Sequence, residues 1–554
     1  MKMVPDDIHT EECSILRRDK CAALAFAALA VLLGSFLIVD GVSGAYHDDG
    51  IYVTVAKAIA QGDGYRLIHL PDAPVQTKYP FLYPAILAVI WKISPSFPGN
   101  LLLMQWVSLL SGAIAAGLSY LYLIRFGYCS RGVAAAAVAL SVTLPSFLFF
   151  CTSCLSEMPF ALLLVVTMWM LDRHIRTPFL SRKAQLFLGA LAALPLLCRV
   201  IGLVSIIALI FLAFRYRKIL RWPAAAASLI CILFFGWALT YTKWSDATVS
   251  SSYYTNYLTW WHSFGIPHWG RVLASNAYDA FQGSSLLAQL CQPGLPGWIG
   301  WIAALIGLAG LLVILRQTGH WRVLPVLLAA YLAVVLVWPW PPFRFLAPVQ
   351  PYLFAYSILA AMAACKIRTP ILRYTGTAAL GILILFNAGS LYNDILESRA
   401  NRYPAYMVSY GSPAVHWSDY EEMFLWIRAH SNPGDLFVCA ADPMLYLYTG
   451  RRSFRPYVSR PGSMFYDDPA PAYGALSEVM ANIRSYRPQY LVLAPTPGFA
   501  EEISYSQFLT ESQRKYPGWL ECVYLGKDKR FAIWKIKRVP QSSFHDAALL
   551  KGPH

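Results

Sequence analysis

The sequence predicts an α-helical polytopic membrane protein with a small soluble α/β domain at its C-terminal end. The chain of 554 residues is 57% hydrophobic, and only 14% of its residues are charged. Soluble domains carry about 25% charged residues, so most of this chain is expected to face an apolar solvent. Apolar segments fill residues 1–392, whereas residues 393–554 have the charge and patterning of a soluble domain.

About eleven segments are apolar and long enough to cross a bilayer, which takes ~20 residues. The first follows Arg17, Arg18 and Lys20 and lacks a small-residue cleavage site, which predicts a retained span. The short segment 82–93 is expected to form a half-span or a re-entrant piece. The expected spans are 21–42, 99–124, 132–151, 158–172, 184–198, 201–214, 223–241, 297–315, 323–338, 345–364 and 375–392.

Basic residues predict the orientation of the chain. The net charge is +15, and Lys and Arg gather in the alternate loops 125–131, 173–183, 215–221, 316–322 and 366–373. The positive-inside rule places these loops and the N-terminus in the cytoplasm. The first outer loop (43–81) and the C-terminal domain would then face the periplasm from a bacterial inner membrane. The same rule explains the basic charge, so we expect membrane lipids as partners and no nucleic acid.

The C-terminal segment has the pattern of an α/β domain. A helix is expected at Glu421–His430, and Asn432-Pro433-Gly434 would end it. A second helix is expected near Met444–Thr449. Cys439 and Cys522 would be able to pair in an oxidising compartment. Strands are expected at Leu436–Ala440, Tyr490–Leu493, Tyr524–Leu525 and Phe531–Lys537, the last two as a hairpin.

Two adjacent acids, Asp48 and Asp49, follow the first span and precede Ile51–Gln61. The periodicity of Ile51–Gln61 predicts an amphipathic helix on the membrane surface. At a helix start either acid satisfies free N–H groups. Alternatively, one of them is a general base that takes the proton of an acceptor hydroxyl. A carboxylate also binds divalent cations such as Mg²⁺ or Mn²⁺.

Lys78 and Glu157 are charged residues at the entrances of predicted spans. Lys78 precedes Tyr79-Pro80, and it is either a snorkelling anchor or an ammonium placed to bind the phosphate of a lipid carrier. Glu157, in Ser156-Glu157-Met158-Pro159, lies at membrane depth, where a carboxylate is costly without a partner or a task. It is also placed to begin a helix.

Arg199 and Arg344 depart from the positive-inside pattern, because both fall at the expected outer face. Each is either an anchor to lipid phosphates or a guanidinium that steadies a leaving phosphate.

The order of these segments resembles the GT-C superfamily of membrane glycosyltransferases. It is most similar to the protein O-mannosyltransferases and to the bacterial aminoarabinose transferases that modify lipid A. Two features differ: the acidic pair is Asp-Asp where the mannosyltransferases tend to have Asp-Glu, and Tyr79 stands where a second proline is common. The matching segments are Asp48-Asp49, Lys78-Tyr79-Pro80 with Tyr83-Pro84, Ser156-Glu157-Met158-Pro159, Cys198-Arg199-Val200-Ile201-Gly202, Arg344-Phe345-Leu346-Ala347-Pro348 and Trp426–Arg451.

The resemblance implies transfer of a sugar from undecaprenyl or dolichyl phosphate to a glycan, lipid or protein acceptor at the outer face, with inversion. Asp48 or Asp49 would be the catalytic base. Glu157 would position the acceptor or, with Asp49, a divalent metal ion. The residues that would bind the lipid phosphate or the sugar are Lys78, Arg199, Arg344 and Tyr83.

An aromatic outer loop is the last candidate element. It would cover the sugar or form an interfacial belt, and it contains Tyr253, Tyr254, Tyr257, Trp260 and Trp261.

Two other functions fit the same composition. A transporter or flippase of lipid-linked glycan would place charges in mid-span and show inverted repeats. A non-catalytic assembly subunit would tolerate replacement of Asp48, Asp49 and Glu157.

Overall fold

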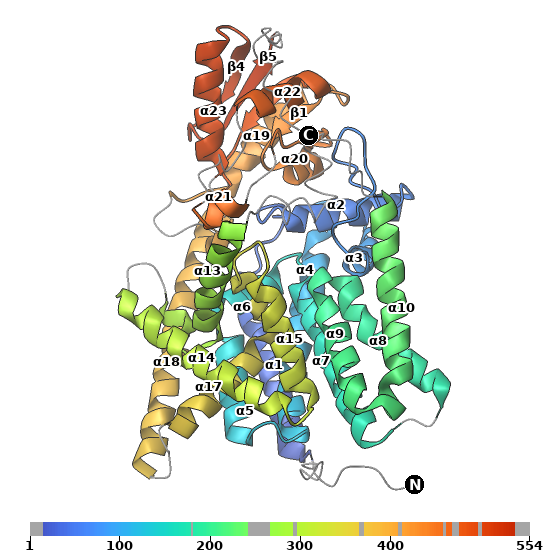
Figure 1. Ribbon diagram of the computed structural model, residues 1–554. Helices are drawn as coiled ribbons and strands as arrows, with labels where there is room; N and C mark the ends of the chain where they lie inside the picture. The colour runs from blue at the N-terminus through green and yellow to red at the C-terminus, as the bar shows by residue number, and fades with distance from the viewer. Residues whose placement is uncertain are drawn as a thin grey trace.

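A bundle of long helices carries the C-terminal α/β domain at one end (Figure 1). The computed structural model describes residues 15–178, 181–241, 266–291, 296–364, 370–407, 413–457, 461–467, 476–496 and 501–537. The aromatic loop with Tyr253 and Trp261 lies outside the described residues.

The bundle contains a helix at each of the expected spans. Short 3₁₀ turns at Val200–Gly202, Ala288–Leu290 and Ala347–Val349 join some of these helices. The bundle helices are α1 (Arg17–Leu37), α4 (Leu101–Arg125), α5 (Arg131–Val142), α6 (Pro145–Thr152), α7 (Glu157–Arg176), α8 (Arg182–Cys198), α9 (Leu203–Arg215), α10 (Arg217–Tyr241), α13 (Ile266–Ser284), α14 (Gly297–Thr318), α15 (Val323–Leu336), α16 (Phe343–Leu346), α17 (Gln350–Ala364) and α18 (Pro370–Asn401).

Fewer of these helices than expected are long enough to span a membrane. Among the described residues, seven helices are long and apolar enough to cross a membrane. If the bent pair α5–α6 is counted as one span, the number rises to eight. The helices α8, α9 and α15 have 17, 13 and 14 residues. A full span takes ~20 residues, so the count of eleven stays a prediction. The chain is an integral membrane protein.

The described basic loops between α4 and α5 and between α14 and α15 lie at the end of the bundle away from the C-terminal domain (Figure 1). Arg131 pairs with Asp19 at the start of α1, with Nε 2.9 Å from Oδ1. Arg176 and Arg322 both donate to the carbonyl of Phe126. These contacts place the start of α1 and the loops near 125–131, 176 and 322 at one end. The assignment of that end to the cytoplasm stays a prediction.

Two further helices, α2 (Asp48–Gln61) and α3 (Leu82–Ile93), lie between the bundle and the C-terminal domain (Figure 1). The prediction of an α2 helix is confirmed, and it ends at Gly62, which has φ +90°. Its placement on the membrane surface stays a prediction, and the structure adds that the helix is covered on two sides. Nearly all residues from Asp49 to Ala58 are buried, because α3 covers one side and the C-terminal domain the other.

The C-terminal domain is a five-stranded sheet with helices, as the sequence predicts. The strand order is β2-β1-β3-β5-β4, with β1 parallel to β2 and β3, and β5 antiparallel to β3 and β4. Its elements are α19 (Trp417–His430), β1 (Phe437–Cys439), α20 (Asp442–Thr449), β2 (Ser453–Phe454), α21 (Pro461–Phe465), α22 (Leu476–Tyr486), β3 (Tyr490–Leu493), α23 (Glu501–Lys515), β4 (Leu520–Leu525) and β5 (Ala532–Ile536).

The expected disulfide between Cys439 and Cys522 is wrong. Both cysteines are free. Cys439 lies in β1 and Cys522 in β4, and β3 and β5 lie between these strands. Three strand spacings of about 4.8 Å separate them by roughly 14 Å, whereas a disulfide needs Cα atoms within about 7 Å.

Helix α20 docks the C-terminal domain on the loop between α1 and α2. The Tyr448 hydroxyl accepts from the Ser43 backbone N–H at 2.9 Å and donates to the Gly41 carbonyl at 2.5 Å. Gly44 has φ +92°, and a Cβ there would lie 2.6 Å from Cβ of Met444. Only glycine allows the backbone of residue 44 to come this close to Met444. The contact therefore fixes the segment that leads into α2.

Candidate active site

Asp48, the first residue of α2, faces a tyrosine and an arginine. The Tyr79 hydroxyl donates to Asp48 Oδ1 at 2.6 Å. Arg344 Nη1 donates to Asp48 Oδ2, also at 2.6 Å. Tyr79 comes from the loop before α3 and Arg344 from α16, so three distant segments meet at this carboxylate.

Glu157, the first residue of α7, is fully buried and is paired with two guanidinium groups. Arg199 Nη1 lies 2.7 Å from Glu157 Oε1, and Arg344 Nε donates to the same oxygen. Arg199 follows α8 at the 3₁₀ turn. A buried carboxylate is tolerated when such partners neutralise it. Arg344 therefore bridges Glu157 and Asp48.

Lys78 adds a third positive charge beside Asp48. Its side chain is buried, with Nζ 5.1 Å from the centre of the Tyr79 ring. The Gln76 side chain accepts from the backbone N–H of Lys78 at 2.7 Å and so fixes this part of the loop. Burial lowers the pKa of Lys78 to about 7, although the negative charge of Asp48 opposes the shift. The ammonium is thus poised to lose its proton near neutral pH.

The surroundings of Asp48 keep it ionised. Burial alone would raise its pKa, but the positive charges of Arg344 and Lys78 and the hydrogen bond from Tyr79 outweigh burial. The pKa of Asp48 is therefore held well below its usual range. The site as a whole joins two carboxylates, Asp48 and Glu157, to Lys78, Arg199 and Arg344, and has one excess positive charge when Lys78 is protonated.

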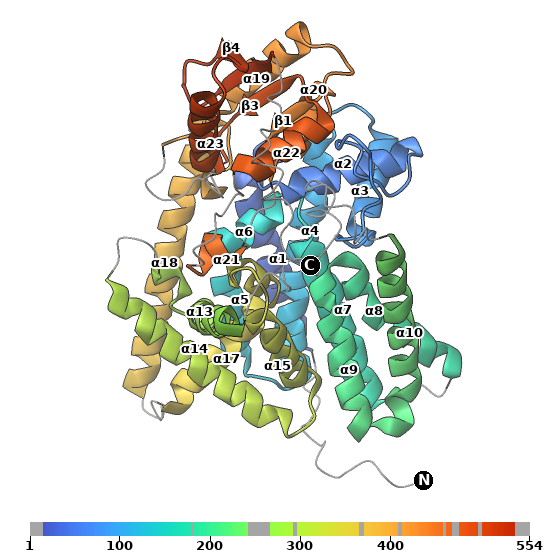
Figure 2. The same ribbon diagram turned by 45° about the horizontal axis from the view of Figure 1, so that its top comes forward.

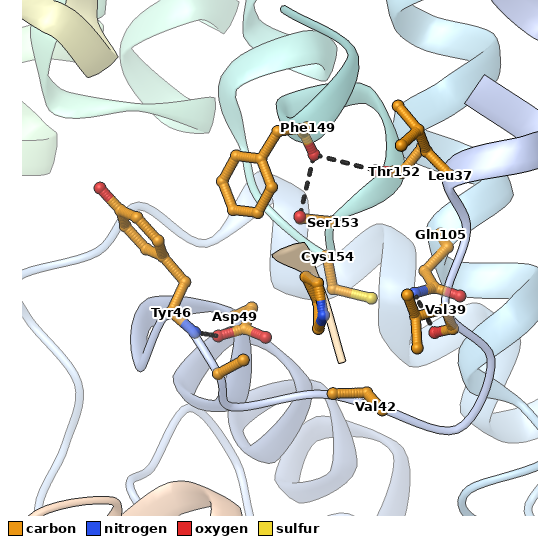
Figure 3. Close-up of a pocket in the computed structure, with 12 residues that line it drawn as sticks. Leu37, Val39, Val42, Tyr46, Asp49, Gln105, Phe149, Thr152, Ser153 and Cys154 are labelled. Carbon is orange, nitrogen blue, oxygen red and sulfur yellow. Dashed lines mark hydrogen bonds between the residues drawn. The ribbon is translucent and has the colours of Figure 1, made fainter. Parts of the chain in front are cut away.

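Asp49 has a different environment. Its Oδ2 accepts from the Gly44 backbone N–H at 2.6 Å, and Oδ1 accepts from that of Tyr46 at 3.0 Å. Burial raises the pKa of Asp49 to about 6 in spite of these bonds. Figure 3 shows Asp49 on the wall of a pocket that Gln105 and Cys154 also line. The two adjacent acids thus separate: Asp48 meets the cations, and Asp49 shapes the turn before α2.

Tyr83 lies behind this site. Its hydroxyl is 3.0 Å from Ser108 Oγ, and its ring packs edge-on against Tyr52. The Tyr52 hydroxyl in turn lies 2.8 Å from Ser156 Oγ, which also accepts from Arg199 at 3.3 Å. Tyr83 is fully buried and supports the residues around Arg199 from behind.

The described residues offer no ready set of ligands for a divalent metal ion. Within the described ranges, no group of three or more His, Cys, Asp or Glu side chains is placed to hold one. Both oxygens of Asp49 accept hydrogen bonds from backbone N–H groups. Two guanidinium groups contact Oε1 of Glu157, whereas its buried Oε2 accepts no hydrogen bond from any described residue. A site with excess positive charge also repels a cation.

Sequence reasoning missed Tyr46, Tyr79 and Ser156 as parts of this site. Tyr79 appears there only as a departure from a family pattern, although its hydroxyl holds Asp48. The Arg344 guanidinium lies 4.7 Å from the centre of the Tyr46 ring, within cation–π range. Tyr79 directly follows Lys78, and Tyr46 lies two positions before Asp48, so proximity to these charged residues was the available signal.

The fold is that of known membrane enzymes. No protein-family model matches the sequence, and no curated protein sequence matches it. The structure is similar to ArnT from Cupriavidus metallidurans bound to undecaprenyl phosphate, with a TM-score of 0.51 and 14% identity, covering 94% of this chain and 99% of that one.

A second similarity is to the oligosaccharyltransferase of Archaeoglobus fulgidus. Its complex with Zn and sulfate matches with a TM-score of 0.54 and 14% identity, covering 85% of this chain and 67% of that one. Its complex with an inhibitory peptide and a dolichol-phosphate, named AglB, gives 0.53 and 13%, covering 86% and 70%. The chain therefore shares the fold of these enzymes, which agrees with the fold that the sequence resemblance predicts.

Proposed function

We propose that this chain is a glycosyltransferase that transfers a sugar from a polyprenyl phosphate to a glycan, lipid or protein acceptor at the outer face of the membrane. The observation that carries the proposal is the Asp48–Arg344–Glu157 bridge with Lys78 and Arg199 beside it. This cluster lies at the end of the bundle that the C-terminal domain covers. ArnT and AglB, with the same fold, hold undecaprenyl phosphate and a dolichol-phosphate.

The charge of the cluster matches one class of donor. A sugar linked through a phosphodiester carries one negative charge, and the cluster has one excess positive charge. A diphosphate-linked donor carries two negative charges and would need a further cation. Because the described residues hold no group of three or more metal-ligand side chains that would bind such a cation, the monophosphate is the better match.

The proposed reaction exchanges one bond at the anomeric carbon. The acceptor oxygen attacks from the face opposite the phosphate, the bond from that carbon to the phosphate oxygen breaks, and the electron pair leaves with the phosphate. Asp48, which is ionised, takes the proton of the acceptor hydroxyl. Lys78, Arg199 and Arg344 stabilise the charge that grows on the leaving phosphate. The configuration at the anomeric carbon is inverted.

Two alternative functions predict other arrangements. A flippase would be expected to carry its charges in mid-span, whereas Asp48, Glu157 and Arg344 lie at or next to the first residues of α2, α7 and α16. An assembly subunit has no need of a carboxylate held ionised among three cations.

The test is sugar transfer by the full chain in liposomes. Undecaprenyl phosphates that carry a labelled pentose or a labelled hexose serve as donors, with cell-envelope lipids and glycans as acceptors. We expect Asp48→Asn to lower transfer by ~10²–10⁴-fold, which is the usual contribution of a general base. Asp63→Asn is the matched control, because Asp63 is an exposed acid of the same loop.

The outcomes are distinct. Transfer by Asp48→Asn at the wild-type rate overturns the catalytic assignment. Wild-type protein that transfers neither sugar, but moves the labelled lipid across the bilayer, supports the flippase instead.

A further inference from the structure

Asp442 is a buried carboxylate of the C-terminal domain that faces two histidines of the first outer loop. It is the first residue of α20, and its side chain is 0% exposed. Its Oδ1 lies 3.0 Å from His47 Nε2, and its Oδ2 lies 3.3 Å from His69 Nε2. Arg455 Nε is 3.7 Å from Oδ1. Each oxygen of this carboxylate therefore contacts a different part of the outer loop.

The first contact acts on the residue next to Asp48. His47 has φ +67°, a backbone conformation that L-residues rarely adopt. Such a conformation persists only where the surroundings enforce it. The contact of the His47 imidazole with the Asp442 carboxylate is one such constraint. The close fit of Gly50 on Pro443, where a Cβ would lie 3.0 Å from the proline Cβ, is another.

The second contact acts on the segment that leads to Lys78. The backbone carbonyl of His69 accepts from the Ser453 N–H at 2.9 Å. The neighbouring Arg452 donates to the carbonyl of Pro71 at 2.9 Å. The loop around His69 is therefore fixed to the C-terminal domain through its backbone as well as through its ring.

The C-terminal domain also reaches the segment before Arg344. The Tyr466 hydroxyl donates to Asn276 Oδ1 at 2.8 Å, and Asn276 Nδ2 donates to the Trp338 carbonyl at 2.7 Å. Arg271 of α13 donates to the carbonyl of Tyr466. Both views place α21 beside α13, away from the sheet (Figure 2). The domain thus contacts the segments that carry Asp48, Lys78 and Arg344.

We propose that Asp442 is a positioning residue: from the C-terminal domain it holds His47 and His69, and so fixes Asp48 and Lys78 relative to the lipid phosphate. This inference rests on the proposed function. Asp442 itself touches no reacting atom. Its removal should therefore change two kinetic constants through two different histidines.

The experiment separates those two paths in the full chain. His47→Asn, which tolerates a positive φ, should lower kcat by roughly 100-fold, the cost of a misplacement of about 1 Å. His69→Gln should mainly raise the KM for the donor. Asp442→Asn should do both. The double variant Asp442→Asn with His47→Asn should have the same kcat as Asp442→Asn alone, because the two residues act through one contact.

Glu511→Gln is the matched control, since Glu511 is an exposed acid on α23 of the same domain. The proposal is overturned if kcat and KM of Asp442→Asn equal those of Glu511→Gln, or if the two substitutions in the double variant act additively. If Asp442→Asn does not fold, the split between His47→Asn and His69→Gln decides.

Hydrogen exchange at the amides of Gly44 and Tyr46 gives a readout without activity. Asp442→Asn should accelerate it, and Glu511→Gln should not. If the wild type transfers no sugar, the proposed function fails. In that case hydrogen exchange alone tests whether Asp442 holds this segment. Unchanged exchange in Asp442→Asn would overturn the positioning role as well.

Discussion

Arg344 and Asp48 form an ion pair of 2.6 Å between Nη1 and Oδ2, although 296 positions separate them in the sequence. The same guanidinium donates through Nε to Glu157. A planar guanidinium with donors at fixed angles suits this double role, which a single ammonium does not reproduce. Arg344 is thus the residue that joins the beginning of α2 to the beginning of α7.

Substitution of the two arginines by lysine should have unequal effects. Arg344→Lys keeps the charge but cannot reach both carboxylates, so either Asp48 or Glu157 loses its hydrogen bond to this residue. A lost hydrogen bond to a charged group costs about 1.5–3 kcal/mol. We expect a lower unfolding temperature and a loss of transfer. Arg199→Lys keeps a partner for Glu157 in Arg344 and should be milder in both measurements. Equal effects would contradict the bridging role.

Donor use should depend on pH through Lys78. Its pKa is lowered to about 7 by burial. The protonated amine binds the phosphate, so kcat/KM for the donor should fall as the pH rises through about 7. In Lys78→Arg the guanidinium stays protonated, because its pKa exceeds about 12, and the fall should disappear. A fall that persists in Lys78→Arg would assign the titration to another group.

Asp49→Asn should act on stability. The amide keeps one acceptor oxygen, so a buried backbone N–H of Gly44 or Tyr46 loses its partner, at about 1–3 kcal/mol of unfolding free energy. Burial raises the pKa of Asp49 to about 6, from about 3.9 in an unfolded chain.

The sign of the pH effect follows from that raised pKa. The corresponding stability is present below pH 4 and is lost as the pH rises through about 6. Thermal unfolding of Asp49→Asn in nanodiscs should therefore vary less between pH 4.5 and 7 than that of Asp63→Asn. Equal pH dependence in the two variants would contradict the environment described for Asp49.

Removal of divalent metal ions should leave transfer unchanged. The acids of the site are paired with guanidinium groups, and the cluster already has an excess positive charge. Transfer measured after dialysis against EDTA should equal transfer with added Mg²⁺ or Mn²⁺. Activity that is lost with EDTA and restored by Mn²⁺ would show that a metal ion does what is assigned here to the arginines.

The sequence predicts the kind of fold from its apolar segments. It predicts most charged residues of the site because their positions depart from the usual distribution of charge in membrane proteins. A carboxylate at the depth of Glu157 and arginines at the outer face, such as Arg199, depart from what a bilayer allows without a reason. The strand Tyr490–Leu493 follows from its short apolar run between turn residues, and the structure has it at the same bounds.

The pairing of these residues could not be predicted in the same way. Nothing local distinguishes Asp48 from Asp49, since both begin α2, and only the approach of Arg344 and Tyr79 separates them. Asp442 looks like an ordinary acid at a helix start before a proline. Its role depends on His47, 395 positions earlier in the chain. The packing of the C-terminal domain on α2 was missed for the same reason, because it joins segments that are far apart in the sequence.

Binding of undecaprenyl phosphate to the purified full chain, measured by native mass spectrometry, tests the central claim most directly. We expect the monophosphate to bind the wild type, and the affinity to fall at least about tenfold in Lys78→Ala, which corresponds to ~1.4 kcal/mol. Asp63→Asn should bind as the wild type does. Unchanged binding in Lys78→Ala, and in a double variant that also carries Arg344→Ala, would contradict a lipid-phosphate site at this cluster.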